Sequence, residues 1–98
     1  MREADFQRQV VDLAKMLGWK VAWTWNSIHS PAGFPDLVLC RGHRLVHAEL
    51  KMEKGKVTEP QAEWLMALAS LPGEVYVWRP SCWKQIERVL SPYRNGGE

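Results

Sequence analysis

The sequence predicts a small mixed α/β (α+β) domain in which helices flank a mixed sheet. Apolar residues spaced by three and four near the start predict a helix, and short runs rich in Val, Leu and Trp predict strands. A second helical pattern separates two of those runs. The expected order is helix, three strands, helix, strand, helix, and 98 residues are expected to form one domain over 1–98.

Residues 2–17 are expected to form the first helix, and Gly18 provides its stop. Its apolar stripe consists of Phe6, Val10, Leu13, Ala14 and Leu17. The same spacing, extended backwards, places Glu3 and Gln7 on or beside the inward face, which is an unusual position for a carboxylate. The alternative is that Glu3 is an acid that the helix dipole favours in the first turn.

Three strands are expected next. Residues 19–25 form the first, a loop at 26–33 follows, and residues 35–40 form the second. Residues 41–44, Arg-Gly-His-Arg, are typical of a hairpin turn, and residues 45–51 return as the third strand. On the first strand, Trp23 and Trp25 would share one face, which is a candidate dimer or DNA surface.

The second half of the chain is expected to contain a helix, a strand and a last helix. Thr58 and Gln61 have the spacing of a capping box. The helix that they start is expected to have an apolar stripe of Trp64, Leu65, Leu68 and Leu71. Residues 74–79 have strand composition, Pro80 and Ser81 are expected to cap a helix through Leu90, and the tail 91–98 is expected to be frayed.

The predicted hairpin brings two carboxylates together. If the turn is centred on Gly42 and His43, alternation along the strands gives one apolar face and one charged face. The apolar face contains Leu37, Leu39, Val46, Ala48 and Leu50, and the charged face contains Asp36, His47, Glu49 and Lys51. Asp36 would then face Glu49, and opposed like charges are destabilising unless something neutralises them. Mg²⁺ suits such a pair of carboxylates; the alternative is a solvated face with Lys51 as counter-ion.

These residues resemble a known nuclease signature. Pro35-Asp36 followed by Glu49-Leu50-Lys51 is similar to the PD-(D/E)xK motif. With Glu3, the string at 33–37 (Gly-Phe-Pro-Asp-Leu) and Gln61 added, the set resembles a stand-alone VRR-Nuc domain, the virus-type replication–repair nuclease. The resemblance extends from Glu3 to about Trp78, and it implies a restriction-endonuclease-like core.

The resemblance also implies roles for individual residues. Asp36, Glu49 and the backbone carbonyl of Leu50 would bind Mg²⁺ or Mn²⁺, and Lys51 would orient or activate the attacking water. Glu3 and Gln61 would lie near the metal cleft as further catalytic residues. Gln61 also has a plain structural interpretation, because it is the third residue of the capping box.

Basic residues lie in the hairpin turn and in the loop after Lys51. They are Arg41, Arg44, Lys54 and Lys56, and we expect them to contact DNA phosphates. The overall balance of 13 Lys and Arg against 11 Asp and Glu does not by itself indicate a nucleic-acid partner. No base-reading helix is evident, which favours recognition of DNA shape over sequence.

Other chemistries fit the sequence less well. Cys40, His43 and His47 are spaced in a way faintly similar to zinc ligands, but a second ligand pair is lacking. No nucleophile elbow surrounds Ser27, Ser30 or Ser81. No apolar stretch approaches a membrane span and the start lacks a signal-peptide core, so a cytoplasmic protein with no membrane partner is expected.

The favoured hypothesis is a Mg²⁺- or Mn²⁺-dependent DNA endonuclease. By resemblance, it would act as a homodimer that resolves four-way (Holliday) junctions, and a compact module of this kind suits a bacterial, phage or other viral source. Two alternatives stay open: a nicking or flap endonuclease, and a non-catalytic DNA-binding module on a nuclease fold. The intact set of Asp36, Glu49 and Lys51 favours catalysis over the second alternative.

Overall fold

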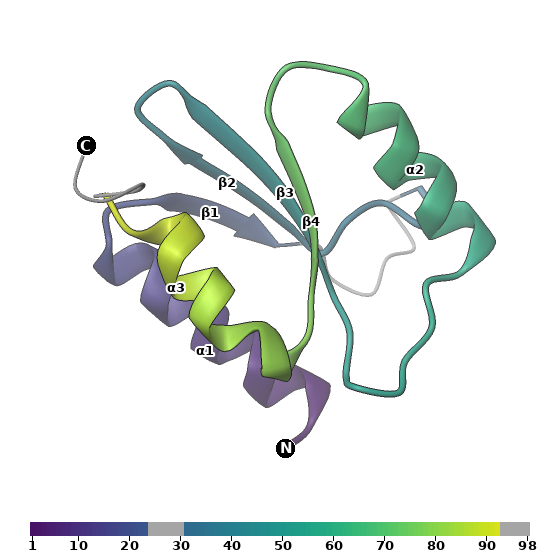
Figure 1. The fold of residues 1–98 in the computed structure, drawn as a ribbon, viewed down its shortest axis with the longest axis horizontal. Helices are drawn as coiled ribbons and strands as arrows, with labels where there is room; N and C mark the ends of the chain where they lie inside the picture. The colour runs from purple at the N-terminus through teal and green to yellow at the C-terminus, as the bar shows by residue number, and fades with distance from the viewer. Residues whose placement is uncertain (24–30, 93–98) are drawn as a thin grey trace.

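The computed structural model describes residues 1–23 and 31–92, and their elements follow the predicted order (Figure 1). The helices and strands are α1 (Glu3–Met16), β1 (Lys20–Trp23), β2 (Leu37–Arg41), β3 (Arg44–Leu50), α2 (Glu59–Ala69), β4 (Glu74–Trp78), the 3₁₀ turn η1 (Pro80–Cys82) and α3 (Trp83–Leu90). The four strands form one sheet in the order β1-β2-β3-β4. β1, β2 and β3 are antiparallel neighbours, whereas β4 lies parallel to β3 because the chain crosses over through α2. The predicted mixed α/β fold is confirmed.

The β2–β3 hairpin has the predicted register. Val38 pairs with His47 and Cys40 pairs with Leu45 across a two-residue turn, in which Gly42 has a φ of 60°. The ladder ends at Leu37 and Ala48, one residue before the expected pair of Asp36 and Glu49. The parity of the strands is nevertheless as expected, so the two carboxylates come from the same end of the hairpin.

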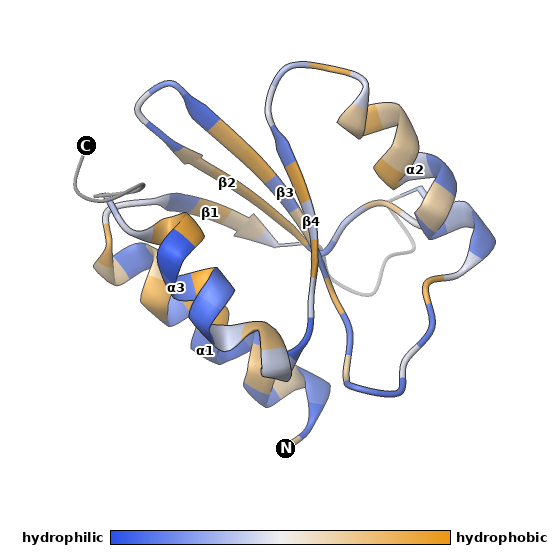
Figure 2. Cartoon of the chain, in the orientation of Figure 1, coloured by the Kyte–Doolittle hydropathy of each residue, from blue (hydrophilic) through white to orange (hydrophobic). Residues whose placement is uncertain are grey.

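The hydrophobic core lies between one face of the sheet and the helices α1 and α3, which pack side by side (Figure 1). All five side chains of the predicted apolar face of the hairpin are fully buried there. They meet Phe6, Val10 and Ala14 of α1 and Ile86 and Leu90 of α3. In Figure 2 the strands carry orange segments interrupted by blue ones, and helices α1 and α3 are of mixed hydropathy.

Helix α2 covers the opposite face of the sheet indirectly. The ring of Trp64 packs edge-on against Phe34 at 5.0 Å between centroids, and Phe34 in turn contacts His47 of β3 at 6.0 Å. No residue of α2 is buried, and Leu71 lies beyond the end of the helix with 58% of its surface exposed. The expected apolar stripe therefore does not extend to Leu71, because the helix ends at Ala69.

Two further expectations concern the ends of elements. Ser81 does not cap the last helix: residues 80–82 form a 3₁₀ turn, and α3 begins at Trp83. The amide and the hydroxyl of Ser81 donate to Glu53 instead. Trp25 and the part of the tail from residue 93 onwards lie outside the described residues, so the proposed Trp23–Trp25 face and most of the frayed tail are not tested. Within the described ranges, no helix is long and apolar enough to cross a membrane.

Candidate active site

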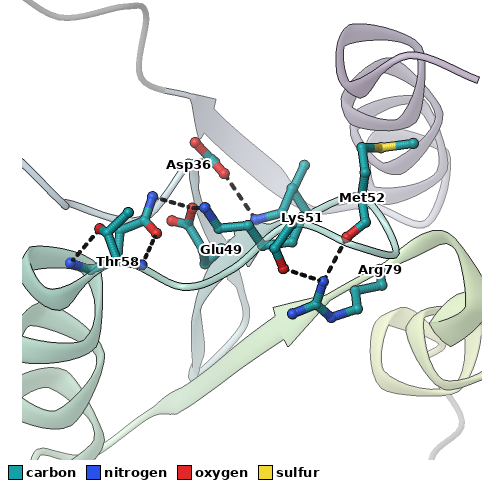
Figure 3. A network of polar contacts seen from close by, with 9 residues as sticks. Asp36, Glu49, Lys51, Met52, Thr58 and Arg79 are labelled. Carbon is teal, nitrogen blue, oxygen red and sulfur yellow. Dashed lines mark hydrogen bonds and ion pairs between the residues drawn. The ribbon is translucent and has the colours of Figure 1, made fainter.

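The site begins with Asp36, which directly precedes β2. Its Oδ2 atom accepts a hydrogen bond of 2.9 Å from the backbone N–H of Leu50, the last residue of β3. This bond continues the pairing of the hairpin with a side chain after the backbone ladder has ended at Leu37. It orients the carboxylate of Asp36 toward the end of β3 (Figure 3).

Glu49 is the only buried charged residue in the described part of the chain. Its Oε2 accepts a hydrogen bond of 2.9 Å from the Gln61 side-chain amide, and the Lys51 ammonium lies 3.9 Å from the same oxygen. Its Oε1 is buried and has no hydrogen-bond donor among the described residues. Burial raises the pKa of Glu49 to about 8, helped by the charge of Asp36 and opposed by Lys51. The positive charge near Glu49 is therefore too small to offset the burial of its carboxylate.

Gln61 connects the site to the start of α2. Its backbone N–H donates to the Thr58 hydroxyl at 3.3 Å, and its side-chain oxygen accepts from the Thr58 amide at 2.9 Å, so the predicted capping box is present. The side-chain nitrogen of the same amide group donates to Glu49. The two interpretations of Gln61 are compatible, because the cap uses its oxygen and the site uses its nitrogen.

Gly33 brings the loop before Asp36 against the same turn of α2. It has a φ of 88°, and a Cβ atom placed on it would lie 2.5 Å from the carbonyl carbon of Pro60 and 2.7 Å from the Gln61 nitrogen. Only glycine combines this backbone conformation with so close an approach. Gly33 therefore sets the spacing between the Asp36 loop and the residue that binds Glu49.

The residues present fit a hard divalent cation. A buried carboxylate oxygen without a donor, next to a second carboxylate, is a ligand set that Mg²⁺ and Mn²⁺ favour. Within residues 1–23 and 31–92, no group of three or more His, Cys, Asp or Glu side chains converges on a metal position. A cation at Asp36 and Glu49 would thus need backbone or water oxygens as well, which agrees with the expected use of the Leu50 carbonyl.

Glu3 lies at the margin of this site. Its side chain is exposed in the first turn of α1, where the helix extends beyond the core that starts at Phe6, so it is not buried with the inward stripe. Its negative charge is nevertheless among the causes that raise the pKa of Glu49. Glu3 is therefore an exposed carboxylate whose charge contributes to the electrostatic field at Glu49.

Arg41 and Arg44 lie away from the site, contrary to the expectation that they flank it. Arg44 pairs with both oxygens of Glu74 at 2.8 Å, donates to the carbonyl of Val89, and lies over the ring of Trp19. Arg41 donates to the carbonyl of Leu17. Strand alternation explains the difference, because Arg44 has the parity of Val46 and Ala48 and therefore faces α1 and α3.

Lys54 and Lys56 lie closer to the site than the two arginines. Both are exposed in the segment between β3 and α2, which starts at Lys51. They remain candidate DNA contacts. The zinc alternative is not supported, since His47 packs against Phe34 and the described residues contain no cluster of three metal-binding side chains.

Arg79 is a site neighbour that sequence reasoning missed. It directly follows β4, and its Nη1 atom donates to the carbonyls of Met52, Glu53 and Gly55, just after Lys51 (Figure 3). Backbone carbonyls leave no trace in residue types, so the only signal was an arginine at the end of the predicted strand 74–79, directly before Pro80. The parallel crossover brings it back beside the end of β3.

Comparisons with known proteins agree with this architecture. No family model matches the sequence, and no curated protein matches it. Among solved structures, a protein described as a VRR_NUC domain protein matches with a TM-score of 0.71 at 20% identity, over 99% of this chain and 95% of the other. The chain has the VRR_NUC domain fold. At this level of identity the likeness concerns the fold alone.

A second solved structure with this VRR_NUC-like fold is Hjc from Archaeoglobus fulgidus, a Holliday junction resolvase from an archaeal hyperthermophile. It matches with a TM-score of 0.60 at 23% identity, over 79% of this chain and 69% of the other. The resemblance to VRR-Nuc domains that the sequence motifs indicated is confirmed at the level of the fold. Asp36, Glu49 and Lys51 lie close together at the end of the β2–β3 hairpin of this fold.

Proposed function

We propose that this protein is a metal-dependent, structure-specific DNA endonuclease. The observation that supports the proposal most strongly is the buried Glu49 carboxyl group beside Asp36, with one oxygen that lacks a donor. Burial and the charge of Asp36 destabilise the ionised Glu49 carboxylate, and Lys51 offsets this only in part. The pair is therefore suited to hold a cation.

The residues of the site have separate tasks in this proposal. Asp36, Glu49 and the Leu50 carbonyl would hold Mg²⁺ or Mn²⁺, which supplies charge neutralisation at the scissile phosphate and acidifies a bound water. The Lys51 ammonium, 3.9 Å from Glu49, places a further positive charge where the attacking water would be oriented. Gln61 keeps the Glu49 carboxylate in one rotamer. Lys54 and Lys56 would bind the DNA backbone on the outside.

We propose that the substrate is a four-way junction. The chain would act as one domain over 1–98 and would cut the junction as a homodimer. The fold shared with an archaeal Holliday junction resolvase favours this choice among branched DNAs. A dimer places two equivalent sites about a two-fold axis, which suits symmetric incision of two strands. Sedimentation at micromolar concentration measures the oligomeric state. A protein that stays monomeric with and without DNA contradicts junction resolution.

The decisive experiment compares cleavage of labelled four-way junction, flap, nicked and linear duplex DNA in Mg²⁺, Mn²⁺ and EDTA. We expect paired symmetric cuts in the junction that are lost in EDTA and reduced by orders of magnitude in Asp36→Asn and Glu49→Gln. Glu87→Gln, an exposed carboxylate on α3, is the matched control and should cut normally.

The other outcomes separate the alternatives. Cleavage of flaps or nicked duplex alone would keep the nuclease and reject junction resolution. Binding without cleavage in either metal would instead indicate a non-catalytic DNA-binding module. Loss of folding in Asp36→Asn would contradict a catalytic role for that residue, because its carboxylate would then be needed for the structure.

A further inference from the structure

The backbone folds back on itself directly after Lys51. The N–H of Gly55 donates to the carbonyl of Met52 at 3.0 Å, which closes a tight turn over residues 52–55, called here the 52–55 turn. It lies between the end of β3 and the start of α2. A turn outside regular structure needs other contacts to keep one position.

Arg79 supplies the first of these contacts. Its Nη1 atom donates to the carbonyls of Met52 at 2.6 Å, Gly55 at 2.7 Å and Glu53 at 3.2 Å. Three carbonyl oxygens of one turn thus converge on one charged donor, and hydrogen bonds from a charged group are stronger than neutral ones. Because Arg79 follows β4 without a break, the turn is held at the edge of the sheet.

Glu53 and Ser81 supply a second contact between the same two segments. The carboxylate of Glu53 accepts from the Ser81 amide at 2.6 Å and from the Ser81 hydroxyl at 2.9 Å. Both groups are exposed, so this contact is expected to be weaker than that of Arg79. The turn is therefore attached to residues 79–81 at its backbone and through one side chain.

The 52–55 turn also restricts the conformations of the Lys51 side chain. A Cβ atom placed on Gly55 would lie 3.4 Å from Cδ of Lys51, so the backbone at Gly55 is adjacent to the lysine stem. The backbone N–H of Lys51 donates to the carbonyl of Trp78 at 2.9 Å. Only 14% of the side chain is exposed, and its ammonium lies 3.9 Å from Glu49. Lysine has four rotatable side-chain bonds, so a fixed ammonium requires such a wall.

We propose that Arg79 is a positioning residue, which fixes the 52–55 turn against the stem of Lys51 and so keeps the Lys51 ammonium beside Glu49. Arg79 does not touch the reacting atoms in this proposal. The catalytic consequence rests on the proposed nuclease function, whereas the effect on Lys51 can be measured without it. Preorganisation of a charged group is a large contribution to catalysis, and residues that support a metal site from outside typically contribute 10–100-fold.

The experiment compares Arg79→Met and Arg79→Lys with Arg88→Met, a matched control at an exposed arginine of α3. The first readout is the rate at which an amine-reactive acyl ester modifies Lys51 in metal-free protein without DNA, measured by mass spectrometry. Lys84, exposed on α3, serves as the internal reference. The second readout is kcat and KM for cleavage of the preferred DNA.

We expect Arg79→Met to raise the modification of Lys51 several-fold relative to Lys84, and to lower kcat about 10–100-fold with little change in KM. Arg79→Lys should recover part of both effects, because an ammonium can donate to some of the same carbonyls. Arg88→Met should match the wild type. An unchanged Lys51 rate in folded Arg79→Met would overturn the proposal, and so would an equal rise at Lys84.

A second variant covers failure of Arg79→Met to fold. Glu53→Ala removes the two hydrogen bonds to Ser81 at an exposed position and should raise the Lys51 rate in the same direction by a smaller factor. No change at Lys51 in folded Arg79→Lys together with no change in Glu53→Ala would then overturn the proposal. If the wild type cleaves no DNA, the nuclease proposal fails, and the labelling result alone decides the role of Arg79.

Discussion

In the protein without bound metal, the ionised form of Glu49 is destabilised because its carboxyl group is buried beside another carboxylate. Its pKa rises from an ordinary 4.5 to about 8 in the folded state. Between these values the folded protein keeps a proton that the unfolded chain has released, so the free energy of unfolding falls as the pH rises. Below about pH 4.5 both states are protonated, and this loss is absent.

We therefore predict that Glu49→Gln is more stable than the wild type in EDTA at pH 8, and that the difference shrinks toward pH 5. A neutral amide has no charge to desolvate, so its stability should not depend on pH through this window. Urea unfolding of both proteins from pH 5 to 8 measures the effect. Equal pH dependence of the two proteins would show that Glu49 is ionised without penalty in the fold.

Arg44 and Lys54 are both basic residues near the hairpin, but their surroundings differ. Arg44 is only 22% exposed and holds Glu74 and the end of α3, whereas Lys54 is exposed after β3. We predict that Arg44→Met lowers the free energy of unfolding by about 2 kcal/mol, while Lys54→Met leaves it within about 0.5 kcal/mol.

DNA binding should show the reverse pattern for the same two variants. Lys54→Met should weaken binding and reduce its salt dependence by about one phosphate contact, and Arg44→Met should leave both unchanged where it is folded. Urea unfolding and binding measured at several salt concentrations check the pair. Weaker binding in Arg44→Met alone would mean that the hairpin turn, and not the segment after β3, contacts DNA.

Alternation along the hairpin explains what could be predicted for single residues. It correctly placed Leu37 and Val46 on the opposite face from Glu49. Successive side chains of a strand alternate between the two faces of the sheet, and the turn sets the register. The same rule applied to Arg44 would have placed it on the core side, where its guanidinium is used. The backbone carbonyls that Arg44 and Arg79 bind could not be predicted, since they belong to segments far away in sequence.

At the scale of elements, the loop before β2 and the first turn of α2 behave as one unit. Gly33 contacts the backbone of Pro60 and Gln61, and the two segments deliver Asp36 and the partner of Glu49. The motif residues themselves were evident in the sequence. Their joint placement depends on a close backbone approach, which sequence patterns do not describe.

We predict that Gly33→Ala lowers the free energy of unfolding by about 2–4 kcal/mol and also lowers the cleavage rate. The added Cβ would meet the Pro60 carbonyl carbon at 2.5 Å in a left-handed backbone conformation. Gly42→Ala is the control, because it has a φ of 60° and an open surrounding, so only the backbone term of about 1 kcal/mol applies.

Thermal unfolding and cleavage assays of both glycine variants measure these effects. Equal stability losses in the two variants would contradict the tight packing of Gly33 against α2. A normal cleavage rate in Gly33→Ala would mean that the spacing between Asp36 and Gln61 is not critical.

The elements themselves were predictable to different degrees. The first helix, the hairpin and the capping box at Thr58 were predicted because local spacing and turn chemistry specify them. The exposure of Leu71 was not predicted, since α2 ends at Ala69 and Leu71 lies beyond it. The 3₁₀ turn at 80–82 was missed because Ser81 binds Glu53 from a distant segment instead of capping α3.

At the scale of the whole molecule, a metal ion bound at the proposed site would couple binding to stability. A cation that binds Asp36 and Glu49 in the folded state only would stabilise the protein as its concentration exceeds the dissociation constant, by about 2.7 kcal/mol at a hundredfold excess. It would also displace the proton on Glu49, so binding should tighten as the pH rises toward 8.

We predict that Mg²⁺ or Mn²⁺ raises the melting temperature of the wild type by several degrees relative to EDTA, and more at pH 8 than at pH 6. Glu49→Gln should show little of this shift, and Glu87→Gln should retain it. Differential scanning calorimetry at both pH values is the measurement. A shift of the same size in Glu49→Gln would place the ion elsewhere.

The two faces of β3 also have a consequence for how such a protein can change over generations. Val46, Ala48 and Leu50 form the core, while His47 and Glu49 face the other way, so stability and chemistry are encoded by interleaved but separable positions. A lineage can therefore replace the residues on the face opposite the core and still inherit a folded domain. The same separation makes the positions on that face of the hairpin the natural place to randomise when this scaffold is engineered for a new ligand.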